Sequence, residues 1–119
     1  MKIAIPTSGT DLNAPLDARF GRAKYFLIYD TETKETTVIE NLQNLNAAQG
    51  AGIQSGQTIV RAGAQVVLAG HCGPKAFAVL AAAGINVFLA TSGSVGSAVD
   101  AFLAGKLTAM DSADVEGHW

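Results

Sequence analysis

The residues best suited to chemistry in this chain stand together in one turn, where His71 and Cys72 lie between Gly70 and Gly73. Cys72 is the only cysteine, and His71 is one of two histidines. Imidazole and thiolate are ligands for copper, zinc and iron-sulfur species. The two glycines let the backbone approach a ligand closely or adopt positive φ. This turn is therefore the first candidate binding site.

Two simpler chemistries fit the turn poorly. Two ligands are too few for a closed structural zinc site, and the chain has no other cysteine. A catalytic Cys-His pair needs mutual reach and an orienting acid, and sequence neighbours rarely provide that geometry. Cys72 is equally well interpreted as a small buried core residue. The pattern favours binding over covalent catalysis and leaves the role of Cys72 open.

A helix is expected to start directly after this turn. Pro74 suits the first helical position, and the N–H groups at a helix N-terminus favour anions. Lys75 opposes the helix dipole in the first turn, so it either extends into solvent or compensates a bound anion.

A long loop precedes the second predicted strand and carries Arg19 and Arg22. At about eighteen residues it exceeds the usual connection, and loops of that length are usually functional or mobile. The guanidinium groups could reach an anionic ligand, since arginine keeps its charge and offers a fixed fork of donors. Alternatively they solvate the loop or pair with Asp11 and Asp17.

Apolar patterning predicts an α/β domain made of five strands and three helices. The expected strands are 2–6, 25–30, 35–42, 65–69 and 85–90, with the third at a sheet edge. The expected helices are 50–61, 74–83 and 95–103, the first with Ile53, Ile59 and Val60 facing inward and the last two ending at Gly84 and Gly105. The remaining 106–119 is predicted to be an extended segment that docks through Trp119.

The connections predict how the strands are arranged. A hairpin at 30–34 and two helical crossovers require a mixed sheet, of which the simplest order is 3-2-1-4-5 with strand 2 reversed. The carboxyl ends of the other strands and the N-termini of the helices then meet at one edge, here called the carboxyl edge. Ligands bind open sheets at such an edge. Its turns are 7–9, 50–52, 70–73 and 91–94, where Ser92 and Ser94 are expected to be helix caps and Ser92 also a ligand contact.

Composition excludes several classes of function. The chain has 119 residues, of which 49% are hydrophobic and 15% charged, enough for one compact domain spanning 1–119. A net charge of −2 argues against nucleic-acid binding. The apolar runs are too short for a membrane span, and without a leader pattern or disulfide pair we expect a cytoplasmic protein.

Several motifs in order resemble one known family. They are 1–6 (MKIAIP), 16–23 (LDARFGRA), 25–30 (YFLIYD), 50–54 (GAGIQ), 70–77 (GHCGPKAF) and the closing His118-Trp119. Together they are similar to the dinitrogenase iron-molybdenum cofactor biosynthesis family, which includes cofactor carriers of nitrogen fixation and the orange-protein group. The resemblance covers nearly the whole chain.

The resemblance implies a ribonuclease H-like fold and a non-catalytic carrier or scaffold for a labile molybdenum-containing metal-sulfur cluster, of molybdenum-copper or iron-molybdenum type, exchanged with donor and acceptor proteins. Nuclease activity is not expected, because strands 2–6 and 65–69 lack the carboxylates that two-metal chemistry needs. The alternative is a regulatory module that binds a small anionic metabolite or a protein. The cluster is expected to contact Arg19, Arg22, Gly50, Gly52, Gly70, Gly73, Lys75 and Ser92, with His71 and Cys72 as candidate metal ligands.

Overall fold

The computed structural model describes residues 1–41, 51–91 and 93–110. Its five-stranded sheet has the order β3-β2-β1-β4-β5, which confirms the predicted topology. β2 runs antiparallel to β1 and β3, whereas β4 is parallel to β1 and β5. The strands are β1 (Lys2–Thr7), β2 (Tyr25–Asp30), β3 (Thr36–Glu40), β4 (Val66–Ala69) and β5 (Asn86–Leu89).

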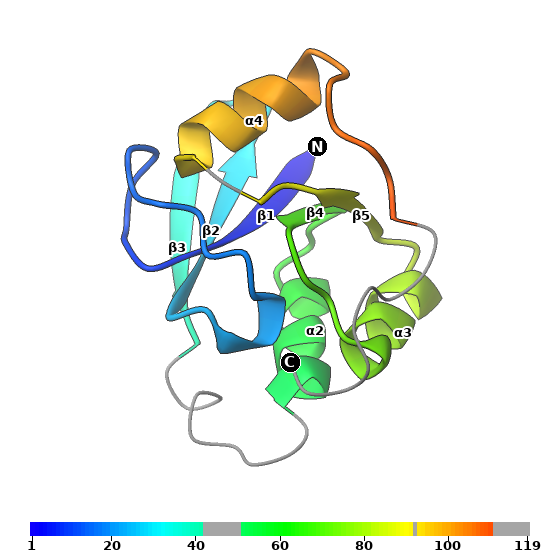
Figure 1. The fold of residues 1–119 in the computed structure, drawn as a ribbon. Helices are drawn as coiled ribbons and strands as arrows, with labels where there is room; N and C mark the ends of the chain where they lie inside the picture. The colour runs from blue at the N-terminus through cyan, green and yellow to red at the C-terminus, as the bar shows by residue number, and fades with distance from the viewer. Residues whose placement is uncertain (42–50, 92, 111–119) are drawn as a thin grey trace.

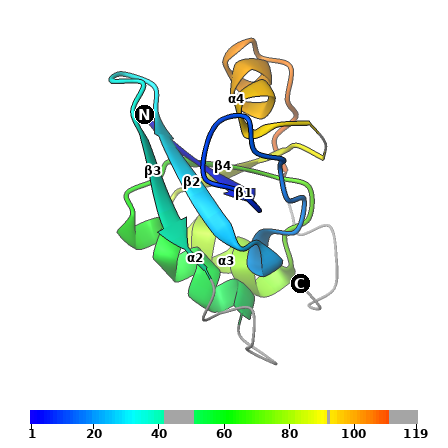
Figure 2. The same cartoon turned by 90° about the vertical axis from the view of Figure 1, so that its left-hand side faces the viewer.

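The helices cover both faces of the sheet. They are α2 (Ala51–Arg61), α3 (Pro74–Ala82) and α4 (Val95–Leu103), together with the short 3-10 helix η1 (Phe20–Arg22). α4 lies on one face and α2 and α3 lie on the other, as both views show (Figures 1 and 2). None of the helices among the described residues is long and apolar enough to cross a membrane.

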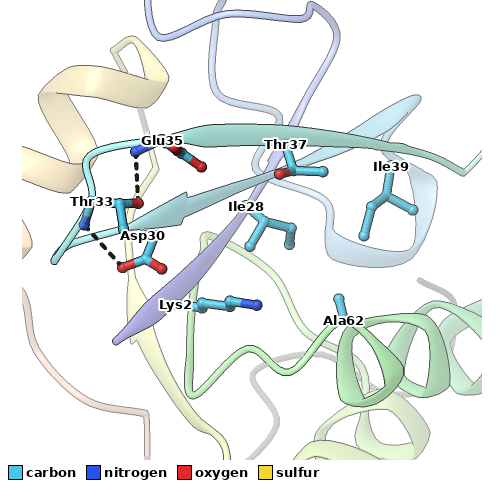
Figure 3. A pocket seen from close by; sticks show the side chains of 8 residues that line it. All are labelled: Lys2, Ile28, Asp30, Thr33, Glu35, Thr37, Ile39 and Ala62. Atoms are coloured by element: carbon cyan, nitrogen blue, oxygen red, sulfur yellow. Dashed lines mark hydrogen bonds between the residues drawn. The ribbon is translucent and has the colours of Figure 1, made fainter.

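The hairpin between β2 and β3 is fixed by the carboxylate of Asp30. Its Oδ1 accepts hydrogen bonds from the backbone N–H of Glu32 at 2.9 Å and of Thr33 at 3.4 Å. These bonds, with that from Glu32 the stronger cause, lower the pKa of Asp30 below its usual 3.8. A hollow of ≈ 290 Å³ opens beside this hairpin, with Lys2 and Ile28 in its wall (Figure 3).

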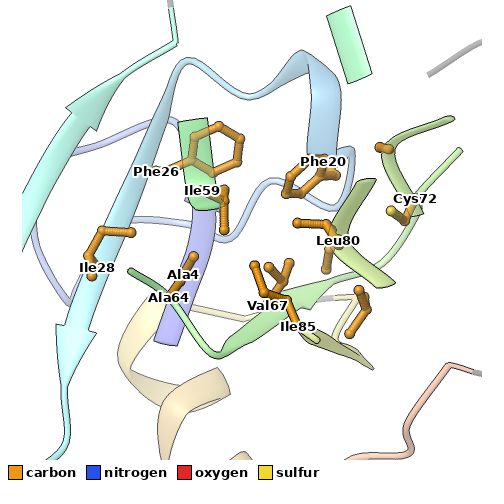
Figure 4. Close-up of a cluster of buried hydrophobic side chains, with 13 residues drawn as sticks. Ala4, Phe20, Phe26, Ile28, Ile59, Ala64, Val67, Cys72, Leu80 and Ile85 are labelled. Carbon is orange, nitrogen blue, oxygen red and sulfur yellow. The ribbon is translucent and has the colours of Figure 1, made fainter. Parts of the chain in front are cut away.

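Two apolar cores follow from this layering. One fills the space between α4 and the sheet, with Ile3, Ile5 and Val95 at its centre. The other lies between the sheet and helices α2 and α3, and its side chains include Phe20, Ile59, Val67, Cys72 and Leu80 (Figure 4).

One expected inward position on α2 is wrong. Ile59 is fully buried, but Val60 is 39% exposed. Gly56 and Ser55 are buried on the inner side of the helix instead. A Cβ on Gly56 would lie only 3.0 Å from Val79 Cγ1, so α2 approaches α3 through small residues, and Val60 lines an open hollow beside this contact together with Val79.

Residues 106–110 form an extended segment along the outer edge of β5. Phe88 and Ala109 form an antiparallel bridge, Leu89 N–H donates to Thr108 O at 2.8 Å, and Met110 N–H donates to Val87 O at 2.8 Å. This part of the predicted extended tail is confirmed, and it covers the backbone of an edge strand that would otherwise be open to pairing with other chains. The expected docking of Trp119 falls in 111–119, outside the described residues.

Candidate functional site

The long loop between β1 and β2 lies across the carboxyl edge of the sheet. Leu16 N–H donates to Gly93 O at 3.0 Å, and Val95 N–H donates to Ala14 O at 2.9 Å, so the loop is held to the start of α4. At its other end the loop is held to the turn after β4, through Ala18 and Phe20. The loop is thus an ordered part of the edge, and its backbone sets the place of both arginines.

The loop brings Arg19 next to His71. These two residues form an isolated parallel bridge, in which His71 N–H donates to Ala18 O at 2.7 Å and Phe20 N–H donates to His71 O at 3.0 Å. His71 is partly exposed and Arg19 is exposed. Two predicted site residues that are distant in sequence are therefore backbone neighbours.

Gly70 has a steric role in this arrangement. Its N–H donates to Ala18 O at 3.0 Å, so it is already used within the protein and is not a donor to a ligand in this structure. A Cβ at Gly70 would lie 2.8 Å from Ala18 Cβ and 3.2 Å from Ala90 O. The absence of a side chain lets the loop reach the turn.

Arg19 pairs with Asp17, which is one of the alternatives that the sequence left open. Its Nε lies 3.5 Å from Asp17 Oδ1, and its backbone N–H donates to the same oxygen at 3.0 Å. The Arg19 side chain is still 51% exposed, so its guanidinium remains accessible. Arg22, in η1, is partly exposed and makes no ion pair with any residue that the structure describes.

The N-termini of α3 and α4 differ in how they are capped. Ser94 and Ser97 form a reciprocal capping box at the start of α4, which confirms the expected role of Ser94. α3 begins at Pro74 after the N-cap Gly73, and no side chain of the described residues caps it. The N–H groups of Lys75 and Ala76 have no acceptor within an α-helix at these positions. Together with the exposed Lys75, they make the start of α3 suited to an anion.

Cys72 lies in a different environment from its neighbour. Its side chain is fully buried in the core cluster that includes Leu80 and Phe20 (Figure 4). Direct ligation of a surface metal by this thiol would require the side chain to leave the core. The turn therefore presents His71 to the edge and Cys72 to the interior.

The structure describes two of the four remaining predicted contacts. Gly52 and Gly73 are buried in the described structure. Gly50 and Ser92 lie outside the described residues. Within the described ranges, no three His, Cys, Asp or Glu side chains gather in a way that could hold a metal ion.

A hollow of ≈ 530 Å³ opens at the same edge, between the end of β5, α4 and segment 106–110. Thr91, Ser97 and Lys106 are among its lining residues. Arg19, Arg22, His71 and Lys75 do not line it. These four predicted contacts therefore lie outside this hollow.

Sequence reasoning missed the part played by Ala18. Its carbonyl oxygen accepts hydrogen bonds from both Gly70 and His71 and thereby joins the loop to the turn. Because the group involved is a backbone carbonyl, the residue type carries no signal for it.

Sequence comparisons identify proteins that are similar to this chain. The sequence model of the dinitrogenase iron-molybdenum cofactor family matches residues 1–105. An uncharacterized protein of Methanocaldococcus jannaschii is 34% identical over 110 residues, covering 90% of this chain and 89% of that protein.

The solved structures that are similar over nearly their full length include two at more than 30% identity. The apo form of the orange protein from Desulfovibrio gigas has a TM-score of 0.93 at 36% identity, covering 96% of each chain. A Thermotoga protein, described as a candidate NifB protein, has a TM-score of 0.85 at 39% identity, covering 98% of each chain.

Proposed function

This chain belongs to the dinitrogenase iron-molybdenum cofactor family, and from that premise we propose that it is a non-catalytic carrier or scaffold for an anionic, molybdenum-containing metal-sulfur cluster. The family and the likeness to the orange protein support a cofactor-associated role. The cluster would be cargo of molybdenum-copper or iron-molybdenum type, received from one protein and delivered to another.

The observation that carries this proposal is the uncapped start of α3 beside His71. Backbone N–H groups at a helix N-terminus favour negative charge. Lys75 adds a positive charge in the same turn, and the loop bridge places Arg19 next to His71. A multiply charged sulfide cluster matches this arrangement of donors and cations.

The cationic side chains and the backbone N–H groups at the start of α3 would hold an anion through charge and hydrogen bonds. Arg19, Arg22 and Lys75 would supply charge, and the N–H groups of Lys75 and Ala76 would donate hydrogen bonds to sulfide. His71 is the side chain that we propose to donate to the cluster or ligate it. Cys72 would contribute through its place in the turn, because its side chain is buried.

A titration with tetrathiomolybdate plus copper(I) tests these roles. Since an exposed ion pair contributes about 0.2–1 kcal/mol, replacing Arg19, Arg22 and Lys75 together with alanine is expected to weaken binding about tenfold. The salt dependence of the remaining binding should decrease, because fewer charges are left to be screened. The change in the visible charge-transfer band reports binding.

Lys34→Ala is the matched control, because Lys34 lies in the hairpin between β2 and β3 and outside the carboxyl edge. It removes one positive charge and is expected to leave the affinity unchanged. Equal losses in Lys34→Ala and Lys75→Ala would show that only net charge matters, and would contradict a site at α3.

A small anionic metabolite is the second candidate ligand, because the uncapped start of α3 suits any compact anion. Inorganic phosphate is the probe for this alternative. Binding of phosphate at micromolar concentration, without binding of the molybdenum-copper probe, would favour a regulatory anion-binding module over a cluster carrier.

A further inference from the structure

A buried polar junction lies where η1 joins β2, and we infer that Asn41 and Ser55 are positioning residues for the anion site, acting through Arg22. This inference rests on the proposed function, since Arg22 matters here as a cation of that site. Neither residue needs to touch the ligand.

Asn41 follows directly after β3 and holds two successive carbonyl groups. Its side-chain Nδ2 donates to Ala23 O at 2.9 Å, and its backbone N–H donates to Lys24 O at 2.9 Å. Ser55 on α2 donates from Oγ to Asn41 Oδ1 at 3.1 Å. The junction thus ties the residue after η1 to the sheet and to a helix at once.

The burial of these polar groups points to a positional role. Among the described residues, the buried polar side chains are Thr7, Asn41 and Ser55, each fully buried, and two of these three form the junction. Burying a polar side chain costs free energy unless it is hydrogen-bonded, and apolar residues of the same shape are often about as stable. A satisfied network instead specifies one arrangement of the elements that it joins.

Arg22 belongs to the segment that this hydrogen-bonded junction holds in place. At its entry η1 is held to the turn after β4, because Phe20 N–H donates to His71 O at 3.0 Å. At its exit η1 is held by Asn41 through Ala23. Arg22 lies between these two attachments, immediately before Ala23. Both attachments therefore help to fix the place of Arg22 relative to His71.

A double-mutant cycle with tetrathiomolybdate plus copper(I) tests this coupling. Asn41→Leu removes the bonds to Ala23 O and Ser55, and we expect it to weaken probe binding about fivefold, typical of residues coupled in one network. In an Arg22→Ala background, Asn41→Leu should cause no further loss. A second fivefold loss in that background would overturn the inference, because Asn41 would then act independently of Arg22.

Ser55→Ala is a milder variant that tests the same junction if Asn41→Leu does not fold. Ser55→Ala should also weaken probe binding. Thr58→Ala is its matched control, since Thr58 lies on the same helix and its hydroxyl donates to Gln54 O within α2. Thr58→Ala should leave the affinity unchanged. Equal effects of Ser55→Ala and Thr58→Ala would contradict the inference.

Amide hydrogen exchange provides a readout that needs no ligand. The Arg22 N–H donates to Arg19 O at 3.3 Å, and its exchange should become faster in Ser55→Ala while that of Val67, in β4, stays the same. Unchanged exchange at Arg22 would overturn the inference. If the parent protein binds no probe, the proposed function fails, and the exchange rates still decide whether the junction positions η1.

Discussion

His71 and Cys72 are adjacent in sequence, but the turn sends them into different surroundings. The backbone of His71 is bonded to the loop that carries Arg19, whereas the thiol of Cys72 is fully buried in the core. Sequence alone could place both in the turn, but it could not decide between a ligand and a core residue for Cys72. That choice depends on which elements pack over the turn.

The two residues should respond differently to substitution. Cys72→Ala leaves a small cavity in the core and is expected to lower the free energy of unfolding by about 1–2 kcal/mol while the folded protein still binds tetrathiomolybdate with copper. His71→Ala should change stability little and weaken probe binding. Urea unfolding and the visible titration measure the two effects; loss of binding in folded Cys72→Ala would identify the thiol as a ligand.

Gly70 is the residue that allows the loop to meet the turn. Gly70→Ala would place a Cβ 2.8 Å from Ala18 Cβ, so we expect destabilisation by about 1–3 kcal/mol. Adding Ala18→Gly should recover part of this loss, because that clash disappears while the close contact with Ala90 O at 3.2 Å remains. Thermal unfolding measures the recovery, and equal stabilities of the single and double variants would contradict the steric role.

At the scale of elements, the order of the strands could be predicted because each local signal agrees with the next. The hairpin turn, the two crossover helices and Gly84 and Gly105, with φ of 75° and 73°, all appear where the pattern placed them. η1 was not predicted. Its three residues contain Gly21 and lack a helical repeat, and its ends are held by bonds to His71 and Asn41 from other parts of the chain.

The structure at the polar end of β3 also could not be predicted from the sequence. The pattern extends this strand to residue 42, yet β3 ends at Glu40 and Asn41 is fully buried. An asparagine after an edge strand looks like a solvent-exposed turn residue in the sequence. Its partners, Ala23 and Ser55, are 18 and 14 residues away along the chain, so only the fold reveals its role.

The β2–β3 hairpin should make stability depend on acid pH. The pKa of Asp30 is lowered, chiefly by the hydrogen bond from Glu32, so this carboxylate stabilises the fold above about pH 3.8, and the contribution is lost as the pH falls through the folded pKa. Asp30→Asn keeps an oxygen acceptor but does not ionise. Urea unfolding at pH 7 and pH 3 should show a larger loss for the parent than for Asp30→Asn; equal losses would rule out this linkage.

In the whole molecule, apolar side chains pack on both faces of the sheet, and the candidate site lies at its carboxyl edge. Both faces of the sheet are closed by helices, and segment 106–110 closes the outer edge of β5. The carboxyl edge gathers the uncapped start of α3, Lys75 and the loop that brings Arg19 to His71. The candidate site is therefore a surface built by the fold from residues that are distant in sequence.

Metal and acid-labile sulfide analysis, with a visible spectrum, on protein purified anaerobically without a metal-affinity tag decides whether this chain carries a cluster. We predict molybdenum and sulfide in stoichiometric amounts, together with a charge-transfer band, either directly or after addition of tetrathiomolybdate and copper. Repeated absence of molybdenum, copper, iron and sulfide, with no band after reconstitution, would contradict a cluster carrier.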